Sequence, residues 1–359
     1  MTKRIGILNS GGDCAGLNTV IDAVVKGLDD EFEIIGFYRG YEGLLENNYV
    51  QLDRAYTSQH RWIGGTILKS TNHGNFPSRR STEPFDSQEI ENITKAYDNY
   101  QALGLEGLII LGGDGTLFTA YRLQEFGFKI IGIPKSIDND LASTDFTFGF
   151  HTAVEIANNA IDNLHTTAAS HDRIMVLEVM GRTAGWISLY AGIAGGANII
   201  LIPEIPFSFE SIIKFLDFRS AQLNKSTIII VSEAALSQGG YQKFTTMDSY
   251  SGNEVHFGGI GEEISRYINN NSGYEARSVA LGHLQRGGSP IAFDKILSTE
   301  FGAFGAQLIK QGQYGKMAAH INNQIVAVDL GEAVLSLKLV NPEGQLVKLA
   351  KSIGISFGE

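Results

Sequence analysis

Residues 108–140 of the chain read LIILGGDGTLFTAYRLQEFGFKIIGIPKSIDND, and this stretch decides the fold class. It contains two apolar, β-branched runs, 108–111 and 129–133, and each of them leads into a polar loop. Near-continuous apolar strands that alternate with helix-length segments are typical of parallel sheets covered on both faces. In such sheets ligands bind at the carboxyl ends of the strands, so we expect a site where these two loops begin.

The first loop, GGDGT over 112–116, suits a polyphosphate. Its glycines leave backbone N–H groups free to face phosphate oxygens, and Asp114 can meet a metal ion. The structural alternative is a glycine-rich turn in which Asp114 caps the following helix.

The second loop, PKSIDND over 134–140, adds two carboxylates and a cation. Asp138 and Asp140 are one residue apart, so an extended segment would project both to the same side. One carboxylate could act as general base on a hydroxyl while the other helps to hold Mg²⁺. A glycine-rich loop beside clustered carboxylates is typical of phosphoryl transfer, in which positioning and charge stabilisation dominate.

Length and composition narrow the class of protein. The 359 residues exceed the ~250–300 at which one hydrophobic core stops growing, which predicts two domains. The single cysteine, Cys14, allows no intramolecular disulfide and fits a reducing cytoplasm. No apolar run reaches the ~20 residues of a membrane span, and the net charge of −11 argues against nucleic acid as a partner. We therefore expect a cytoplasmic protein that binds neither membrane nor nucleic acid.

Strand and helix patterns alternate along the rest of the chain. We expect further strands over 4–8, 33–38, 173–179, 198–202, 226–231 and 276–281, and helices over 17–28, 87–103, 116–126, 152–167 and 258–270. The composition changes near Phe148–Gly149–Phe150, where we place a domain crossing. The tail beyond Asp329 has alternating apolar residues and is expected to add a helix to the second domain. The expected fold class is α/β, with two doubly wound domains and mainly parallel sheets.

Other glycine-rich loops follow predicted strands. The first strand leads into NSGGDCAGLN over 9–18, which can place backbone donors and a helix dipole at an anion. Neither a Walker A lysine nor the G-x-G-x-x-G spacing occurs there. Further along, VMGRTAGW and YEARSVALGHLQRGGSP place cations beside glycines, namely Arg182, Arg277, His283 and Arg286. In a chain of net charge −11, such local clusters indicate a bound phosphate, which arginine can bind bidentately.

The motifs GGDCAGLN, GGDGT, PKSIDND, VMGRTAGW and GHLQRGGSP, in this order, resemble the 6-phosphofructokinase family over roughly residues 3–325. The resemblance implies transfer of a phosphoryl group to the 1-hydroxyl of fructose 6-phosphate in glycolysis, with Mg²⁺. It also implies two α/β domains with the active site in the cleft between them. Residues 1–149 with about 286–328 would bind the nucleotide, and residues 150–285 with about 329–359 would bind fructose 6-phosphate. A homotetramer whose active sites are shared between subunits is implied as well.

The resemblance assigns roles to individual residues. Asp138 would be the general base, and Asp114 would bind Mg²⁺ with support from Asp140. The other catalytic residues would be Arg182, Ser136 and Lys135. The ATP site would consist of Gly11, Tyr41, Gly113, Asp114, Gly115, Thr116 and Phe118. The sugar phosphate would be bound by Ser136, Asp138, Arg173, Met180, Gly181, Arg182, Glu233, Arg277, His283 and Arg286. Among these, Arg173 and Arg277 match positions that reach over from a neighbouring subunit.

Two positions bear on the phosphoryl donor. ATP-dependent members of the family carry glycine after the GGD aspartate, as at Gly115, whereas diphosphate-dependent members usually carry an aspartate that would clash with the α-phosphate. Diphosphate-dependent members carry lysine after the proline of PxxIDND, as at Lys135, where many bacterial ATP users carry glycine. An aspartate at position 115 would exclude ATP by a steric clash, whereas a flexible lysine at position 135 would not. Because position 115 is glycine in this chain, we expect ATP as the donor, with diphosphate as the alternative.

The sequence departs from well-known bacterial members at two other places. An arginine that bridges the phosphates of both substrates is replaced by Asn72, so its role is vacant or passes to Lys135, Lys69, Arg79 or Arg80. Where those enzymes contact an effector nucleotide, this chain has Asp22, His165 and Asn198, and keeps Lys26 and Arg54. We expect activation by ADP to be absent or much weaker, while a different effector stays possible.

Two other functions stay open. GGDGT also occurs in NAD kinases and diacylglycerol kinases, although those families lack the PKSIDND, MGR and GHLQRGG motifs. A non-catalytic sugar-phosphate sensor on the same fold would have lost the base, yet Asp138 and Asp114 are both present.

Overall fold

The computed structural model describes residues 3–28, 31–71, 74–77, 80–222, 225–240, 244–245 and 256–359. The chain forms two compact units, and it crosses between them after His151, Gln285 and Leu337. Unit 1 comprises Met1–His151 and Arg286–Leu337, and unit 2 comprises Thr152–Gln285 and Lys338–Glu359. Among the described residues, no helix is both long and apolar enough to cross a membrane.

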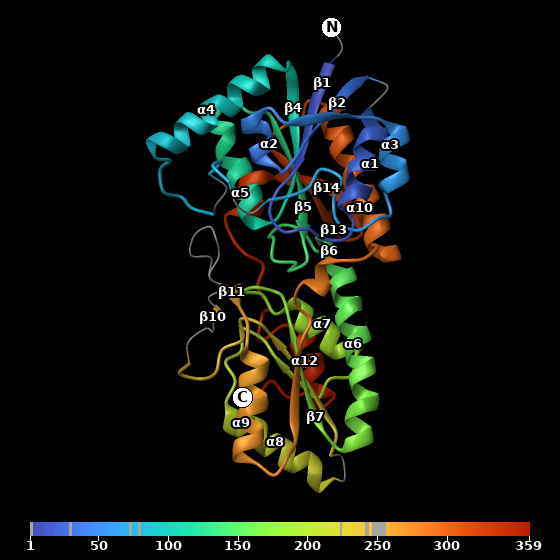
Figure 1. Ribbon diagram of the computed structural model, residues 1–359, viewed down its shortest axis with the longest axis vertical. Coiled ribbons are helices and arrows are strands. Elements are labelled where there is room, and N and C mark those ends of the chain that lie inside the picture. Colours follow the sequence, from blue (N-terminus) through green and yellow to red (C-terminus); the bar gives the residue numbers. More distant parts are fainter. Residues whose placement is uncertain are drawn as a thin grey trace. The chain divides into compact units, whose positions relative to one another are not determined.

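Unit 1 contains an eight-stranded sheet of order β14-β13-β5-β4-β1-β2-β3, with β6 paired to β5 (Figure 1). Its strands are β1 (Lys3–Asn9), β2 (Phe32–Phe37), β3 (Tyr49–Leu52), β4 (Leu105–Gly112), β5 (Ile130–Ser136), β6 (Phe148–Gly149), β13 (Lys316–Ile321) and β14 (Gln324–Asp329). The helices of this unit are α1 (Leu17–Leu28), α2 (Tyr41–Glu46), α3 (Arg54–His60), α4 (Ser87–Ala102), α5 (Asp114–Leu123), the 3₁₀ turn η1 (Gln124–Phe126), α10 (Ala292–Lys310) and α11 (Leu330–Val334). The central strands pair in parallel, and only the edge strands β3 and β14 are antiparallel.

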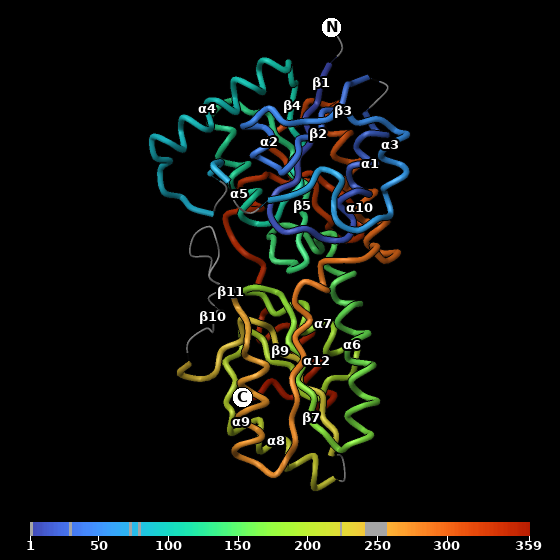
Figure 2. The backbone as a smooth tube through the Cα atoms, viewed as in Figure 1, coloured from blue at the N-terminus to red at the C-terminus, as the bar shows by residue number. Residues whose placement is uncertain are grey.

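Helices cover both faces of this sheet, which is why its central strands are mostly apolar and buried. All seven residues of β5 are buried. Helices α1 and α10 lie side by side in both views (Figures 1 and 2). They approach closely because α10 has glycine at the crossing: a Cβ atom at Gly302 would lie 2.6 Å from the carbonyl oxygen of Val20. Residues of α2, α4 and α5 share one buried cluster with β4.

Unit 2 contains a parallel four-stranded sheet of order β12-β7-β9-β8. Its strands are β7 (Ile174–Val179), β8 (Ile199–Leu201), β9 (Thr227–Ser232) and β12 (Ala276–Ala280), and β10 (Phe244–Thr245) pairs with β11 (His256–Phe257). Its helices are α7 (Trp186–Ala194), α8 (Phe209–Ala221), α9 (Ile260–Asn271) and α12 (Gln345–Ser352). Helix α6 (Phe150–His171) and the 3₁₀ turn η2 (Gly282–Arg286) each include residues of both units.

The C-terminal segment completes the sheet of unit 2. The N–H of Ile200 donates to the carbonyl of Ser356 at 2.9 Å, and the N–H of Ser356 donates to the carbonyl of Asn198 at 3.0 Å. These bonds cover the free edge of β8. Helix α12, which precedes this segment, lies beside α7 (Figure 2).

The predicted α/β class with mainly parallel sheets is confirmed. Every predicted strand and helix occurs, with shifted ends, and α12 is the helix expected in the tail. The assignment of residues 329–337 to the second domain is wrong, because the chain does not leave unit 1 until Leu337. Strand β14 pairs with β13 along its full length, and α11 packs against α5, so both stay with the first sheet.

Candidate active site

Three neighbouring strands of unit 1 end together. Strand β1 pairs with β4, and Asn9 is opposite Leu111; strand β4 pairs with β5, and Gly112 is opposite Pro134. The loops that follow, residues 10–16, 113 and 137–147, therefore leave the same edge of the sheet. The chain runs from β1 outward to β2 on one side, while β4 lies on the other. This reversal of strand order is where parallel α/β sheets bind ligands.

The loop after β1 is held by two cations. Gly11 has φ +79°, a left-handed conformation that favours glycine. The ammonium of Lys135 donates to the carbonyl of Gly12, and Nη1 of Arg286 donates to the carbonyl of Asp13 at 3.1 Å. Burial lowers the pKa of Lys135, a shift that nearby Cys14 opposes and nearby Arg286 reinforces. The loop thus has two positive charges beside its backbone, although Arg286 was expected with the sugar phosphate.

The loop after β4 opens directly into α5. The helix begins at Asp114 itself and its N-cap residue is Gly113, so the alternative in which Asp114 occupies the capping position is wrong. A Cβ atom at Gly112 would lie 2.3 Å from Cγ2 of Thr116, so packing requires glycine there. Among the described residues, a Cβ atom at Gly115 would meet only the backbone nitrogen of Arg80, at 3.9 Å. Packing against the described part of the chain therefore does not account for glycine at position 115.

Two residues that are expected to line the nucleotide have buried side chains. Tyr41 is 1% exposed, stacks on Phe76 with 4.8 Å between ring centroids, and donates its hydroxyl to the carbonyl of Thr116 at 2.8 Å. Burial raises the pKa of Tyr41 well above its ordinary value. Phe118 is 4% exposed and belongs to the same buried cluster. The bond from Tyr41 ties this buried cluster to the first turn of α5, and the nucleotide contacts expected of Tyr41 and Phe118 stay a prediction.

The IDND segment is a turn rather than an extension of β5. Asn139 has φ +53°, and the strand ends at Ser136. The hydroxyl of Ser136 accepts from the N–H of Asp138 at 3.0 Å and donates to Asp140 at 3.3 Å. The expectation that both carboxylates project to one side of an extended segment is therefore wrong. Asp138 and Asp140 are 6% and 2% exposed, and the turn holds both.

The described residues contain no group of three or more His, Cys, Asp or Glu side chains that could hold a metal ion. Asp114 and Asp140 follow neighbouring strands, so each can provide one carboxylate. A hard divalent cation bound mainly through phosphate oxygens and water needs only one or two protein carboxylates. The acidic residues present fit such an ion.

In unit 2 the turn after β7 carries the expected arginine. Gly181 has φ +145° and Arg182 has φ +48°, a left-handed backbone conformation that is unfavourable for arginine. The N–H of Met180 donates to Oε1 of Gln285 at 2.8 Å, and the N–H of Arg182 donates to Oε1 of Glu233 at 3.0 Å. These bonds connect the carboxyl ends of β12, β7 and β9, and His283 lies exposed in η2 beside them.

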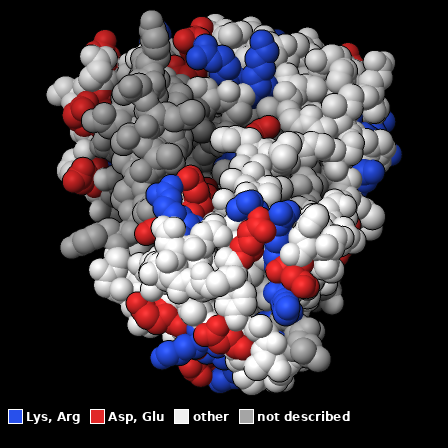
Figure 3. Space-filling view, turned by 60° about the horizontal axis from the view of Figure 1, so that its bottom comes forward, with Lys and Arg blue, Asp and Glu red and all other residues white. Residues whose placement is uncertain are grey.

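Arg173 and Arg277 lie at the opposite end of these strands. Arg173 precedes β7 and Met180 follows it, which separates them by roughly 20 Å at ~3.3 Å per residue. Both arginines pair with Glu275, at 3.0 and 2.7 Å, and hydrogen bonding from Arg173 lowers the pKa of that carboxyl. On the face drawn in Figure 3, basic side chains adjoin acidic ones in this way. Within one chain, the structure does not bring these two arginines to the Arg182 turn.

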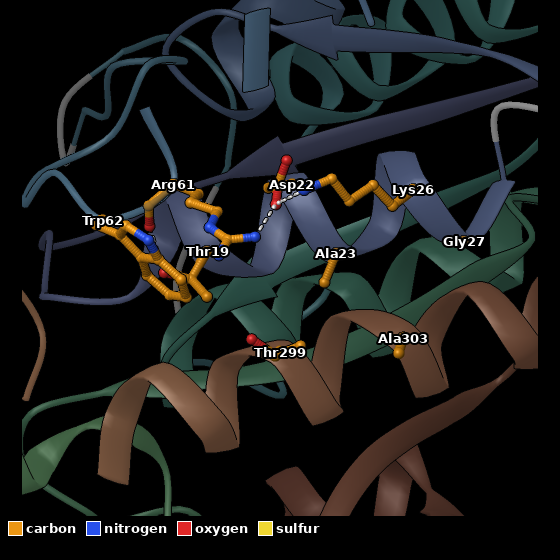
Figure 4. Close-up of a pocket in the computed structure, with 9 residues that line it drawn as sticks. All are labelled: Thr19, Asp22, Ala23, Lys26, Gly27, Arg61, Trp62, Thr299 and Ala303. Carbon is orange, nitrogen blue, oxygen red and sulfur yellow. Dashed lines mark hydrogen bonds and ion pairs between the residues drawn. The ribbon is translucent and has the colours of Figure 1, made fainter. Parts of the chain in front are cut away.

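The residues of the expected regulatory site fall into two places. Asp22, Lys26, Arg61 and Trp62 line a cavity of about 310 Å³ between α1 and α10 in unit 1 (Figure 4). The Asp22 carboxylate accepts from Lys26 at 2.8 Å, from Thr57 at 3.0 Å and from Ser58 at 3.1 Å. Arg54 donates to the carbonyl of Lys26. In unit 2, His165 bonds the carbonyl of Gly195, and Asn198 accepts from the N–H of Ile228.

The residues considered as replacements for the missing arginine differ in position. Asn72 and Arg79 lie outside the described residues. The guanidinium of Arg80 donates to the carbonyl of Leu335 at 3.1 Å, and the carbonyl of Lys69 accepts from the side chain of Asn9. Of this set, Lys135 is the residue whose cation contacts the loop after β1.

One carboxylate near the Arg182 turn, that of Glu204, was not predicted from the sequence. Glu204 accepts from the N–H of Gly185 at 3.0 Å and from the N–H of Val340 at 2.8 Å. Glu204 follows β8 by three residues, at the carboxyl end of the sheet, and this position after a predicted strand could have identified it as a candidate site residue.

Comparison with known proteins gives a consistent result. The family model described as phosphofructokinase matches residues 4–309. A protein of Chloroflexus aggregans named ATP-dependent 6-phosphofructokinase is 47% identical over 359 residues, which cover 99% of this chain and 98% of the relative. A Streptomyces coelicolor protein named pyrophosphate–fructose 6-phosphate 1-phosphotransferase is 43% identical, with 99% of this chain and 100% of the relative covered.

A solved structure agrees with these relatives. The crystal structure of Pichia pastoris phosphofructokinase in the T-state superposes with a TM-score of 0.80 at 28% identity, covering 98% of this chain and 36% of that one. The match of the family model over most of the sequence and the full-length relatives lead to one conclusion. The chain belongs to the phosphofructokinase family.

Proposed function

We propose that this protein transfers the γ-phosphoryl group of ATP to the 1-hydroxyl of fructose 6-phosphate, giving fructose 1,6-bisphosphate in glycolysis. The observation that carries the proposal is the convergence of three loops at the switch point of unit 1. The loop after β1 has two cations beside its backbone, and the glycine-rich loop after β4 leads directly into helix α5. The loop after β5 holds the buried carboxylate of Asp138. Phosphate binding, donor positioning and proton removal each have a group suited to them.

The donor phosphates are proposed to bind at the glycine-rich loops. Backbone N–H groups at the start of α5 and its helix dipole attract anionic oxygens. Lys135 and Arg286 add positive charge where a dry, preorganised site makes it most effective. Asp114 and Asp140 would hold Mg²⁺, which, when bound, neutralises charge on the phosphates.

Asp138 is proposed as the general base. Its backbone N–H is fixed by the hydroxyl of Ser136, so the carboxylate is held in position to take the proton of the attacking hydroxyl. Arg182 is proposed to stabilise charge on the transferring phosphoryl group. Met180, Gly181, Glu233 and His283 are proposed to bind the sugar phosphate. The contact of Arg286 with the carbonyl of Asp13 supports a place for this arginine near phosphate as well.

The proposed donor is ATP rather than diphosphate. Among the described residues, the atom nearest to a Cβ at Gly115 is the backbone nitrogen of Arg80, at 3.9 Å, so a bound ligand is the reason that we propose for glycine at this position. Relatives with either name are similarly close to this chain, at 47% and 43% identity. Lys135, which the family resemblance associates with diphosphate as the donor, donates a hydrogen bond to the carbonyl of Gly12.

The protein is proposed to act in the cytoplasm as a homotetramer. Arg173 and Arg277 are too far from the Arg182 turn to complete their own chain's site, which supports the family pattern in which they serve a neighbouring subunit. Residues 277–280 of the edge strand β12 are exposed, as an assembly surface would require.

The test is a comparison of donors. With saturating fructose 6-phosphate and Mg²⁺, kcat/KM for ATP should exceed that for diphosphate, and Asp138→Asn should lower kcat by ~10²–10⁴-fold. Much faster turnover with diphosphate would contradict the donor assignment. Phosphorylation of NAD or diacylglycerol, with none of fructose 6-phosphate, would contradict the reaction.

A further inference from the structure

The segment Lys338–Val340, where the chain re-enters unit 2, contacts Trp186 and Glu204 at the end of the turn that carries Arg182. The indole Nε1 of Trp186 donates to the carbonyl of Lys338 at 2.8 Å, and the ammonium of Lys338 lies 5.8 Å from the centroid of the Trp186 ring. The N–H of Val340 donates to Oε1 of Glu204 at 2.8 Å. The same carboxylate accepts from the N–H of Gly185, three residues beyond Arg182.

Glu204 thus joins two segments that are far apart in the sequence. Gly185 is the N-cap residue of α7 and has no side chain with which to cap the helix. The Glu204 carboxylate lies at this helix end, where a negative charge interacts favourably with the helix dipole. A Cβ atom at Gly185 would lie 2.8 Å from Oε2 of Glu204 and 2.4 Å from Cβ of Ile202, so glycine allows this close approach.

We propose that Glu204, acting with the docked segment Lys338–Val340, is a positioning residue for Arg182. The inference rests on the proposed role of Arg182 in phosphoryl transfer. Glu233 fixes the beginning of the turn through the N–H of Arg182, and Glu204 fixes its end through the N–H of Gly185. A backbone with φ +48° at Arg182 needs such support at both ends, because the conformation is otherwise unfavourable.

The central experiment compares Glu204→Ala with Glu204→Gln in the full-length protein. Alanine removes both acceptors, while the glutamine amide oxygen can still accept from Gly185 and Val340. We expect Glu204→Ala to lower kcat by ~10- to 100-fold, since a displacement of about 1 Å at a reacting group can cost that much. KM for ATP should change less than about twofold, because Gly185 and Val340, the described partners of Glu204, both belong to unit 2. Glu204→Gln should restore kcat to within about threefold.

A second readout follows the docked segment itself. Trp186 and Trp62 are the two tryptophans of the chain, so in a Trp62→Phe parent the emission reports Trp186 alone. Adding Glu204→Ala to that parent should shift the emission to longer wavelength, because release of Lys338 exposes the indole. A Trp186→Phe variant should lower kcat in the same direction, and its effect should not add to that of Glu204→Ala.

The matched control is Lys351→Ala, which removes an exposed ion pair to Glu359 in the same tail without touching the turn. Its kcat should equal that of the wild type. Wild-type kcat in Glu204→Ala, whatever its melting temperature, would overturn the proposal, as would an equal loss of kcat in Lys351→Ala. Full activity of Arg182→Ala would instead contradict the proposed role of Arg182, while the Trp186 emission would still report whether Glu204 holds the segment.

Discussion

Replacing Lys135 by an apolar residue should lower the activity of the protein without lowering its stability. Its side chain is 4% exposed, and its ammonium binds a backbone carbonyl rather than a carboxylate. A buried charge carries a desolvation cost of several kcal/mol that a single hydrogen bond of about 1.5–3 kcal/mol does not fully offset. Burial is accordingly the largest cause of its lowered pKa.

We therefore predict the properties of Lys135→Met, in which an unbranched apolar side chain of similar length fills the same space. The melting temperature should stay equal or rise, because the desolvation cost disappears. The value of kcat/KM for ATP should fall by ~10²–10³-fold, which corresponds to the ~2.7–4 kcal/mol that one preorganised donor contributes to a transition state. Calorimetry and steady-state kinetics on the same preparation measure both quantities.

Two results would refute this reasoning. If the melting temperature falls by more than ~5 °C while kcat/KM changes little, Lys135 serves to hold the Gly12 loop and not to bind the donor. If neither quantity changes, the contact with Gly12 contributes to neither. Lys129→Met is a suitable control, because that lysine is exposed and directly precedes the same strand, with its ammonium 5.6 Å from the ring centroid of Tyr314.

Three further predictions concern other residues. Gly115→Asp should fold with an unchanged melting temperature yet lose most of its kcat/KM with ATP, while Gly112→Ala should be destabilised; equal melting losses in both would contradict the reading of these two glycines. ADP should not activate the enzyme at limiting fructose 6-phosphate, because Asp22 already neutralises Lys26; strong activation would show that the pocket accepts a diphosphate. Burial raises the pKa of Glu204 above its ordinary value of 4.5, so the folded state binds this proton more tightly than the unfolded state, and its stability falls as pH rises from the ordinary pKa to the raised one. In urea unfolding, the free energy of unfolding of Glu204→Gln relative to that of the wild type should therefore increase as pH rises from about 4, by at most ~1.4 kcal/mol per pH unit.

The sequence predicted the parallel strands well, because a strand covered on both faces has few alternatives to an apolar, β-branched composition. It did not predict α10, since Gly302 and Gly305 lower the helix propensity of that segment. The reason for Gly302 is the approach to Val20, a contact between residues almost three hundred positions apart. Such long-range packing cannot be read from local patterns.

The candidate site was predicted in its residue types more than in its geometry. The motifs identified the loops, but the turn at Asn139 also depends on the hydrogen bond that the N–H of Thr147 donates to Oδ1 of Asn139, a contact with a residue outside the motif. The family resemblance assigns Tyr41 to the nucleotide, and the structure adds that its side chain is buried and that its hydroxyl donates to the carbonyl of Thr116. The sequence alone does not show that burial, because a buried and an exposed tyrosine have the same sequence signature.

The division of the chain into two interleaved units has a consequence for synthesis. Strand β13 must lie beside β5 before the first sheet is complete, and β13 is made about 180 residues after β5. At the usual ~5–20 residues per second of translation, the edge of β5, all of whose residues are buried in the folded protein, waits on the order of 10–40 s for its partner. During that interval it is an unpaired strand edge of the kind that aggregates, so the nascent chain is expected to need a chaperone until residue 321 has left the ribosome.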